Sequence, residues 1–133
     1  RQEEIDRVLN SALRFIAESE TQVEIRLPRQ SILLAHSQIA AIASHGHRVD
    51  IFTVPGACLE SSMTFGELDT MLRGDERFLP CNRGVLVNMD EALKLDGDSI
   101  LLTDGLRFPL RQRNRLDLIN RFSEYQIKRM KRG

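Results

Sequence analysis

The spacing of apolar residues divides the chain into an amphipathic helix and a strand-rich region. Between residues 3 and 18, apolar side chains recur at helical spacing with charged residues between them: Ile5, Val8, Leu9, Ala12, Leu13 and Ile16. We therefore predict a helix over residues 1–20 and a separate domain over residues 21–133. The helix either packs on this domain or serves as a linker or dimerising segment behind an upstream domain.

From Gln22 onward the apolar period changes to two, which is the period of a half-buried strand. The first strand is expected up to Pro28, since Val23, Ile25 and Leu27 alternate with polar residues. The same pattern, with Asp-Gly turns between the last strands, predicts Ser31–Ala35, Ile39–Ala43, Arg48–Val54, Ala57–Met63, Val85–Asn88, Ala92–Leu95, Ile100–Thr103 and Leu106–Leu110. Residues 44–47 are expected to form a loop.

Two helices are expected within this domain. Thr64 and Glu67 have the spacing of a capping box, and Gly74 is expected to end the helix that Thr64 begins. A last helix is predicted from about Arg113 to Met130, with Leu116, Ile119, Phe122 and Ile127 facing inward. The predicted fold class is therefore mostly β (α+β), with helices added to a multi-stranded fold.

Composition limits the chain to one ordinary domain that does not cross a membrane. Its 133 residues contain no apolar run near the about 20 residues that a spanning helix needs. The first residues resemble neither a secretory signal nor a transit peptide, and the missing initiator Met suggests a piece of a longer protein. Cys58 and Cys81 are too few for a disulfide framework, so we expect a cytoplasmic location.

Charge is distributed unevenly along the chain although the formal net charge is zero. Residues 1–106 contain 10 Lys/Arg and 17 Asp/Glu, whereas residues 107–133 contain 9 and 2. A basic surface built by the C-terminal part would suit a phosphate backbone, an acidic membrane or an acidic protein. The alternative is a solvated helix with a basic tail.

Catalytic and metal-binding motifs are sparse. The chain has no Gly-rich phosphate loop, nucleophile elbow or paired cysteines, and His45 and His47 lack an evident third metal ligand. A cysteine-based enzyme using Cys81 stays open, because catalytic partners of a thiol meet only in space. We expect no cofactor, no metal and no enzymatic activity.

The order of motifs from Thr64 to Arg113 resembles the LytTR family, the DNA-binding output domains of many bacterial response regulators. Phe78, Arg83, Val87 and Asn88 match the family's turn and the strand that follows it. The resemblance covers roughly Val23 to Arg113, and its other elements are Gln38–Ile42, Ser44–His47, Thr64-x-x-Glu67-Leu68 and Pro109–Arg113.

The resemblance implies a ten-stranded fold that places loops into successive major grooves of double-stranded DNA. By this resemblance His47 and Arg113 would contact base edges, and Arg83 would contact the DNA backbone. Further backbone contacts are expected from Arg48, Arg111, Gln112 and Arg115. The implied setting is a homodimer on a direct-repeat site, driven by an upstream receiver or sensor domain that this chain lacks.

Departures from the family pattern lie close to the expected DNA surface. The turn that commonly reads His-Arg-Ser is Asn82-Arg83-Gly84, and Arg111-Gln112 replaces the usual Ser-Arg pair. These departures put the target sequence in doubt more than the fold. They leave open a protein-interaction module that kept the fold and lost DNA binding.

Overall fold

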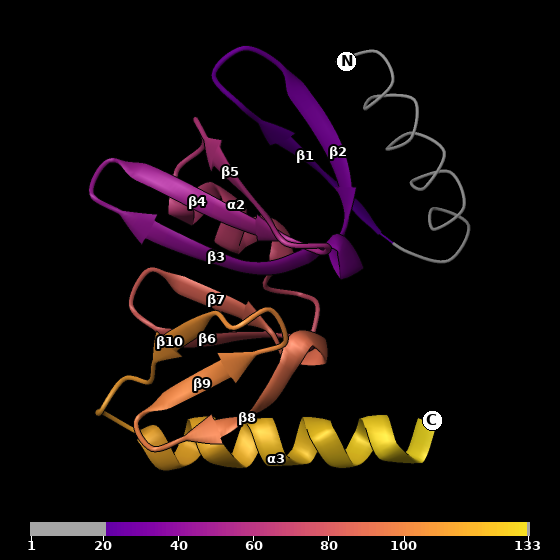
Figure 1. Ribbon diagram of the computed structural model, residues 1–133, viewed down its shortest axis with the longest axis vertical. Helices are drawn as coiled ribbons and strands as arrows, with labels where there is room; N and C mark the ends of the chain where they lie inside the picture. The colour runs from indigo at the N-terminus through magenta and orange to yellow at the C-terminus, as the bar shows by residue number, and fades with distance from the viewer. Residues whose placement is uncertain (1–20, 133) are drawn as a thin grey trace.

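The protein is a multi-stranded fold with a helix near its middle and a long helix at its C-terminal end (Figure 1). The computed structural model describes residues 21–132, so the helix predicted over residues 1–20 lies outside the described residues. Within this range there are ten strands: β1 (Gln22–Arg26), β2 (Ser31–Ala35), β3 (Ile39–His45), β4 (Arg48–Thr53), β5 (Ala57–Ser61), β6 (Phe78–Asn82), β7 (Val85–Asn88), β8 (Ala92–Asp96), β9 (Ser99–Leu102) and β10 (Arg107–Pro109). The helices are α2 (Phe65–Leu72) and α3 (Arg115–Arg132), with 3-10 turns at His36–Gln38 and Met89–Glu91. The predicted fold class is confirmed.

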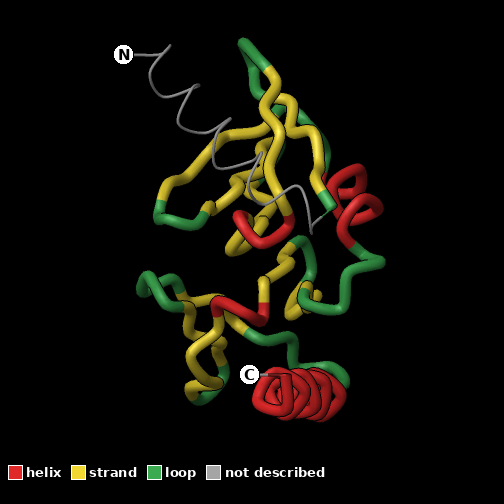
Figure 2. The backbone as a smooth tube through the Cα atoms, turned by 90° about the vertical axis from the view of Figure 1, so that its right-hand side faces the viewer, coloured by secondary structure: helices red, strands yellow, loops and turns green. Residues whose placement is uncertain are grey.

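The strands form three antiparallel sheets. The central sheet has the order β5-β4-β3-β7-β6, the β1–β2 hairpin forms a second sheet, and β10-β9-β8 form the third. The hairpin and α2 cover one face of the central sheet, whereas the third sheet and α3 lie on its other side (Figures 1 and 2). The central sheet therefore separates two cores.

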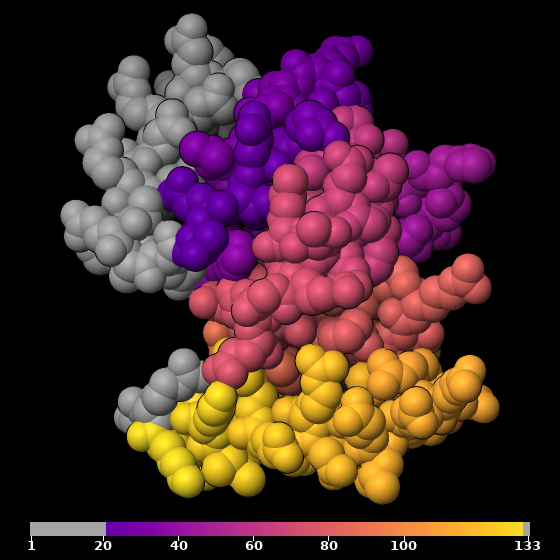
Figure 3. Space-filling view, turned by 180° about the vertical axis from the view of Figure 1, so that it is seen from behind, coloured from indigo at the N-terminus to yellow at the C-terminus, as the bar shows by residue number. Residues whose placement is uncertain are grey.

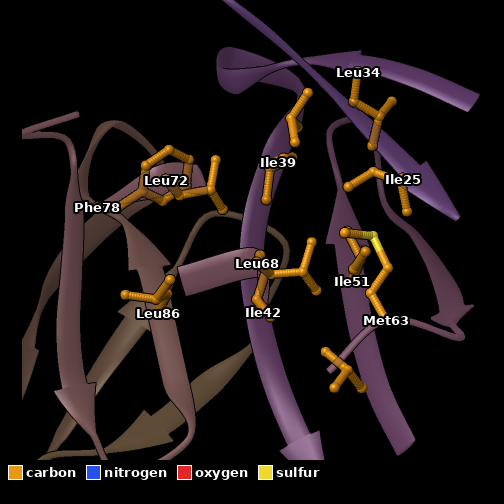
Figure 4. Close-up of a cluster of buried hydrophobic side chains, with 12 residues drawn as sticks. Ile25, Leu34, Ile39, Ile42, Ile51, Met63, Leu68, Leu72, Phe78 and Leu86 are labelled. Atoms are coloured by element: carbon orange, nitrogen blue, oxygen red, sulfur yellow. The ribbon is translucent and has the colours of Figure 1, made fainter. Parts of the chain in front are cut away.

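Alternation along the central strands sends neighbouring residues into opposite cores. Leu86 of β7 and Phe78 of β6 join the core with α2, while Val87 and Leu79 join the core with α3. Figure 4 shows the first of these cores, in which Ile25, Leu34, Ile39, Ile42, Ile51, Met63, Leu68 and Leu72 meet Phe78 and Leu86. Because both faces of these strands are buried, a one-residue register slip would exchange side chains between the two cores.

The capping box at the start of α2 is present as predicted. Thr64 Oγ1 accepts a hydrogen bond from the Glu67 N–H at 3.1 Å, and Glu67 Oε1 accepts one from the Thr64 N–H at 3.0 Å. The helix ends at Leu72, and its last turn is closed by the Arg73 N–H, which donates to Asp69 O. Gly74 directly follows the C-cap residue Arg73, where the sequence predicts the end of the helix, but its backbone is not left-handed.

The buried face of α3 agrees only in part with the predicted one. Phe122 faces the core as predicted, together with Leu118 and Tyr125, whereas Leu116 and Ile127 are 69% and 53% exposed. The helix carries apolar residues on two faces, so helical spacing alone could not select the inner one. The position of Tyr125 is fixed by a polar contact, because its hydroxyl donates to Asp90 Oδ1 at 2.8 Å.

Two strands of the central sheet differ from the sequence expectation. β3 continues through Ser44 to His45, so the predicted loop at 44–47 shrinks to a tight turn. The sequence pattern does not predict β6, which contains Pro80. β6 is the last strand in the order β5-β4-β3-β7-β6, and an edge strand tolerates a proline that cannot donate to the ladder.

A partly buried charge network joins the 3-10 turn at His36 to the segment between α2 and β6. His36 Nδ1 lies 2.8 Å from Asp75 Oδ2, and Arg77 Nε lies 3.0 Å from the same carboxylate oxygen. Burial would raise the pKa of Asp75, but hydrogen bonds from His36 and Arg77 outweigh burial and hold the pKa below its usual value. The ionised carboxylate is thus the form that the fold favours.

The Asp75→Asn variant is expected to lose about 1–3 kcal/mol of unfolding free energy at pH 7, the cost of a broken, partly buried hydrogen-bond network. A depressed pKa stabilises the fold above the unfolded carboxyl's pKa near 4, and this stability disappears as pH falls through the folded pKa. In urea unfolding from pH 7 down to pH 3, the difference in unfolding free energy between the variant and wild type should therefore shrink. A gap that stays constant, or that also occurs in the exposed-site control Glu24→Gln, would contradict this role.

Candidate nucleic-acid interface

Three turns meet along one edge of the molecule, at the left in Figure 1 and as three projections at the right in Figure 3. They are the β3–β4 turn around His47, the β6–β7 turn at Arg83, and the loop 110–114 between β10 and α3. Hydrogen bonds join them in series, since the Ser44 N–H donates to Gly84 O at 2.7 Å and Asn82 Nδ2 donates to Pro109 O at 3.1 Å. The three turns therefore form one continuous surface.

Local sequence explains why these turns are tight. Gly46 and Gly84 have φ values of +65° and +70°, the left-handed conformation that two-residue hairpin turns require. Asn82 supports the second turn, because its Oδ1 accepts a hydrogen bond from the Arg83 N–H at 2.8 Å. Asn114, with φ of +54°, sits just before α3. Short turns of this kind hold exposed side chains at defined positions.

The three side chains given the main DNA contacts by the resemblance all lie on this edge. His47, Arg83 and Arg113 are exposed, one from each turn. Within residues 21–132 the guanidinium groups of Arg83 and Arg113 have no ion-pair partner. Free, exposed guanidinium groups can donate two parallel hydrogen bonds to a guanine or to a phosphate. The geometry brings together these three predicted site residues, while their contacts with DNA stay a prediction.

Two further predicted backbone-contacting residues lie beside them. Arg48 follows the β3–β4 turn, where its Nε is 3.5 Å from Asp50 Oδ1 and its Nη1 is 3.9 Å from Glu60 Oε1. Gln112 is exposed in the loop 110–114. Arg48 is thus partly neutralised before any DNA binds, whereas Gln112 is open to solvent.

The remaining two predicted backbone contacts, Arg111 and Arg115, are engaged inside the protein. Arg111 Nη1 donates to Pro80 O at 3.0 Å and its Nε donates to Arg113 O at 2.8 Å. Arg115 Nη1 donates to Asp98 Oδ1 at 2.6 Å. The sequence places both side chains near the edge, but it could not indicate that their donors are occupied.

Most of the basic C-terminal segment is neutralised in the same way. Acidic residues from earlier in the chain, together with Asp117, pair with five of its nine cations: Arg107, Arg111, Arg115, Lys128 and Arg129. The strong charge separation along the sequence therefore does not become an equally strong separation in space. Arg83 and Arg113 stand out as the unpaired arginines of the three turns.

Several residues shape the edge through contacts that the sequence does not indicate. Gly84 and Ser44 form the contact between two turns, and Asn82 supports the third through Pro109. Asn88 is fully buried, donates to Ile39 O at 2.9 Å and accepts from the Asp90 N–H, so it ties β7 to β3. The Asn-x-Gly pattern at 82–84 was the available signal for a turn, although not for its contacts.

The cysteines do not have the properties of catalytic nucleophiles. Cys81 is fully buried, and burial raises the pKa of its thiol to about 12. Cys58 is exposed on β5, and its pKa is raised by partial burial and by the nearby Asp50 carboxylate. A nucleophilic cysteine needs a depressed pKa, so the geometry does not favour the cysteine-enzyme alternative.

Thiol labelling with Ellman's reagent checks this assignment. In the folded chain only Cys58 is expected to react, because Cys81 is buried and protonated. In denaturant both should react, and Cys58→Ser should abolish labelling of the folded chain. Rapid labelling of Cys81 in folded Cys58→Ser protein would contradict the assignment and revive the enzyme alternative.

Among residues 21–132, no group of three or more His, Cys, Asp and Glu side chains is arranged to hold a metal ion. Over the same residues no helix has the length and apolar character to span a membrane.

Comparison with known proteins agrees with the geometry. Residues 29–122 match the LytTR family, whose description is LytTr DNA-binding domain. Among solved structures, a LytTr DNA-binding domain of a Bacillus cereus protein described as a methyl-accepting/DNA response regulator superposes with a TM-score of 0.59. The two sequences are 14% identical, and the similarity covers 80% of this chain and 96% of that one, which shows a common fold. No curated protein sequence matches the chain. The family match covers most of the sequence, and the chain belongs to the LytTR family of DNA-binding domains.

Proposed function

We propose that this chain is the sequence-specific DNA-binding output domain of a bacterial two-component transcriptional regulator. The observation that carries the proposal is the continuous edge on which His47, Arg83 and Arg113 project from three hydrogen-bonded turns. Each turn supplies at least one exposed hydrogen-bonding side chain, which suits a ligand that extends along the whole edge. Double-stranded DNA is such a ligand.

Each of the three side chains has a role that its chemistry supports. Arg113 donates two hydrogen bonds to guanine O6 and N7 in one major groove, and His47 hydrogen-bonds a base edge in the next. Arg83 lies on the turn between them and contacts the phosphate backbone, with Arg48 and Gln112 as additional contacts. Arg113 and His47 therefore specify the sequence, whereas the others position the domain.

The wider setting is also part of the proposal. Two copies bind a direct-repeat site in the cytoplasm, and an upstream receiver domain controls their pairing through phosphorylation. Support for this setting comes from the family, whose members include the response-regulator domain from Bacillus cereus.

Selection of bound duplexes from a random DNA pool tests the proposal directly. The purified chain should enrich a short motif that recurs as a direct repeat, and its affinity should fall steeply with salt because counterions are released from the DNA. If the chain enriches nothing, the selection is repeated with the chain fused to a dimerising coiled coil. Failure in both forms would reject DNA reading and favour the protein-interaction module.

A further inference from the structure

The loop 110–114 has an internal support that the DNA-contact roles leave unexplained. Arg111 reaches across to β6, where its main-chain N–H donates to Cys81 O at 2.8 Å and its Nη1 donates to Pro80 O at 3.0 Å. Its Nε turns back and donates to Arg113 O at 2.8 Å. A single side chain thus joins the strand before the β6–β7 turn to the main chain of Arg113.

Arg115 completes this support from the first turn of α3. Its Nε donates to Arg111 O and its Nη2 donates to Leu110 O, both at 3.3 Å. Three main-chain carbonyl groups of the loop, those of Leu110, Arg111 and Arg113, therefore accept hydrogen bonds from guanidinium groups. Only arginine offers five donors in a fixed planar fork, which suits it to bridging several carbonyl groups at once.

Both guanidinium groups also have carboxylate partners. Arg115 Nη1 lies 2.6 Å from Asp98 Oδ1, and Arg111 Nη2 lies 3.6 Å from Asp117 Oδ2. The side chains of Arg111 and Arg115 are only 30% and 27% exposed, in contrast to the exposed Arg113 between them. Either side chain would have to break these contacts before it could reach a phosphate.

We infer that Arg111 and Arg115 are positioning residues, which hold the loop so that Arg113 projects from the edge, rather than phosphate contacts. This inference rests on the proposed function, because the position of the loop affects DNA specificity only if Arg113 contacts a base. It also makes Arg83 and Arg113 parts of one unit, since Arg111 joins the Arg113 main chain to the strand that ends at the Arg83 turn. DNA specificity would then depend on two arginines that do not touch DNA.

Arg111→Lys is the variant that separates the two roles, because lysine keeps the charge but cannot bridge Pro80, Arg113 and Asp117 together. A positioning role predicts that affinity for the selected duplex falls by about 5- to 150-fold, which is the range for losing the Arg113 base contact. The salt slope, meaning the slope of log affinity against log salt concentration, should stay unchanged. Specificity should blur at the base pair that Arg113 reads. In an Arg113→Ala background the same substitution should change affinity by less than about twofold, because the residues act through one contact.

Amide hydrogen exchange on the free protein supplies a measurement that does not need DNA. In Arg111→Lys the amides of residues 110 and 111, which donate to Asp98 O and Cys81 O, should exchange about tenfold faster or more. The Val54 amide, which donates to Gln38 O far from the loop, should be unaffected and controls for general unfolding. Arg29→Ala, in the distant β1–β2 turn, controls for loss of a surface charge.

The results separate the inference from the proposed function. Unchanged exchange in Arg111→Lys would overturn the positioning role whether or not the chain binds DNA. Arg111 would be a phosphate contact if Arg111→Lys bound like wild type and Arg111→Ala lowered the salt slope by about 0.9. If amide exchange is faster in Arg111→Lys but the chain binds no duplex, the role of Arg111 in supporting the loop stands. Only the DNA-reading function is then rejected.

Discussion

Replacing Arg113 by alanine should weaken binding to the selected duplex by about 5- to 150-fold, which is the range for one bidentate base contact of 1–3 kcal/mol. Arg113 is exposed in the loop 110–114, and its guanidinium group has no ion-pair partner within residues 21–132. Its five donors are therefore available to a guanine. The effect should fall on one base pair, so the variant's selected motif should lose information at that position only.

Arg83→Ala is the matched control for this experiment. Arg83 is likewise exposed and unpaired in the described part of the chain, but it is expected to contact phosphate. Its loss should weaken binding equally on all sequences and reduce the salt slope by about 0.9. If Arg113→Ala also weakened all sequences uniformly and lowered the slope, Arg113 would be a phosphate contact rather than a base reader.

Ion pairing separates the arginines of this edge more sharply than their sequence positions do. Arg111, Arg113 and Arg115 alternate along five residues, and all three would be counted as parts of one basic cluster. In the structure the first and last face carboxylates and loop carbonyl groups, whereas the middle one faces solvent. A cation already paired inside a protein contributes little net charge toward DNA, so the DNA-facing charge is smaller than the sequence implies.

Features set by local chemistry could be predicted from the sequence. The period-two pattern at Val23–Leu27 and the run at Ser31–Ala35 correspond to β1 and β2, and the Thr64–Glu67 spacing gives the observed helix cap. Such signals succeed because they depend on neighbours within a few residues. The family's motif order added the arrangement of turns, which no local rule supplies.

Features set by distant partners could not be predicted. Leu118 faces the core instead of Leu116 because the rest of the fold, including the contact of Tyr125 with Asp90, selects one of two apolar faces on α3. The partner of Arg115 is Asp98, 17 positions away, and that of His36 is Asp75, 39 positions away. Spacing along the chain carries no information about such pairs, although they decide which charges remain free.

The Gly84→Ala variant is expected to combine the largest loss of stability with a loss of DNA binding. Gly84 has φ of +70°, where an L-residue costs about 1–2 kcal/mol. A Cβ there would also lie 3.0 Å from Ser44 Cβ, and such overpacking adds about 1–3 kcal/mol. Relief of this contact must move the Arg83 turn away from the β3–β4 turn, against the hydrogen bond from the Ser44 N–H to Gly84 O.

Gly105→Ala separates the effect of backbone strain from the effect of the contact with Ser44. Gly105 has φ of +84° in the β9–β10 turn, and nothing lies within 4 Å of the position of its Cβ. It should therefore show only the strain of about 1–2 kcal/mol in urea unfolding and keep its DNA affinity. If both variants lost equal stability and Gly84→Ala still bound DNA like wild type, the contact between the two turns would not position the DNA-reading edge. A larger loss in Gly84→Ala, with weaker binding at temperatures where the variant is folded, would show that it does.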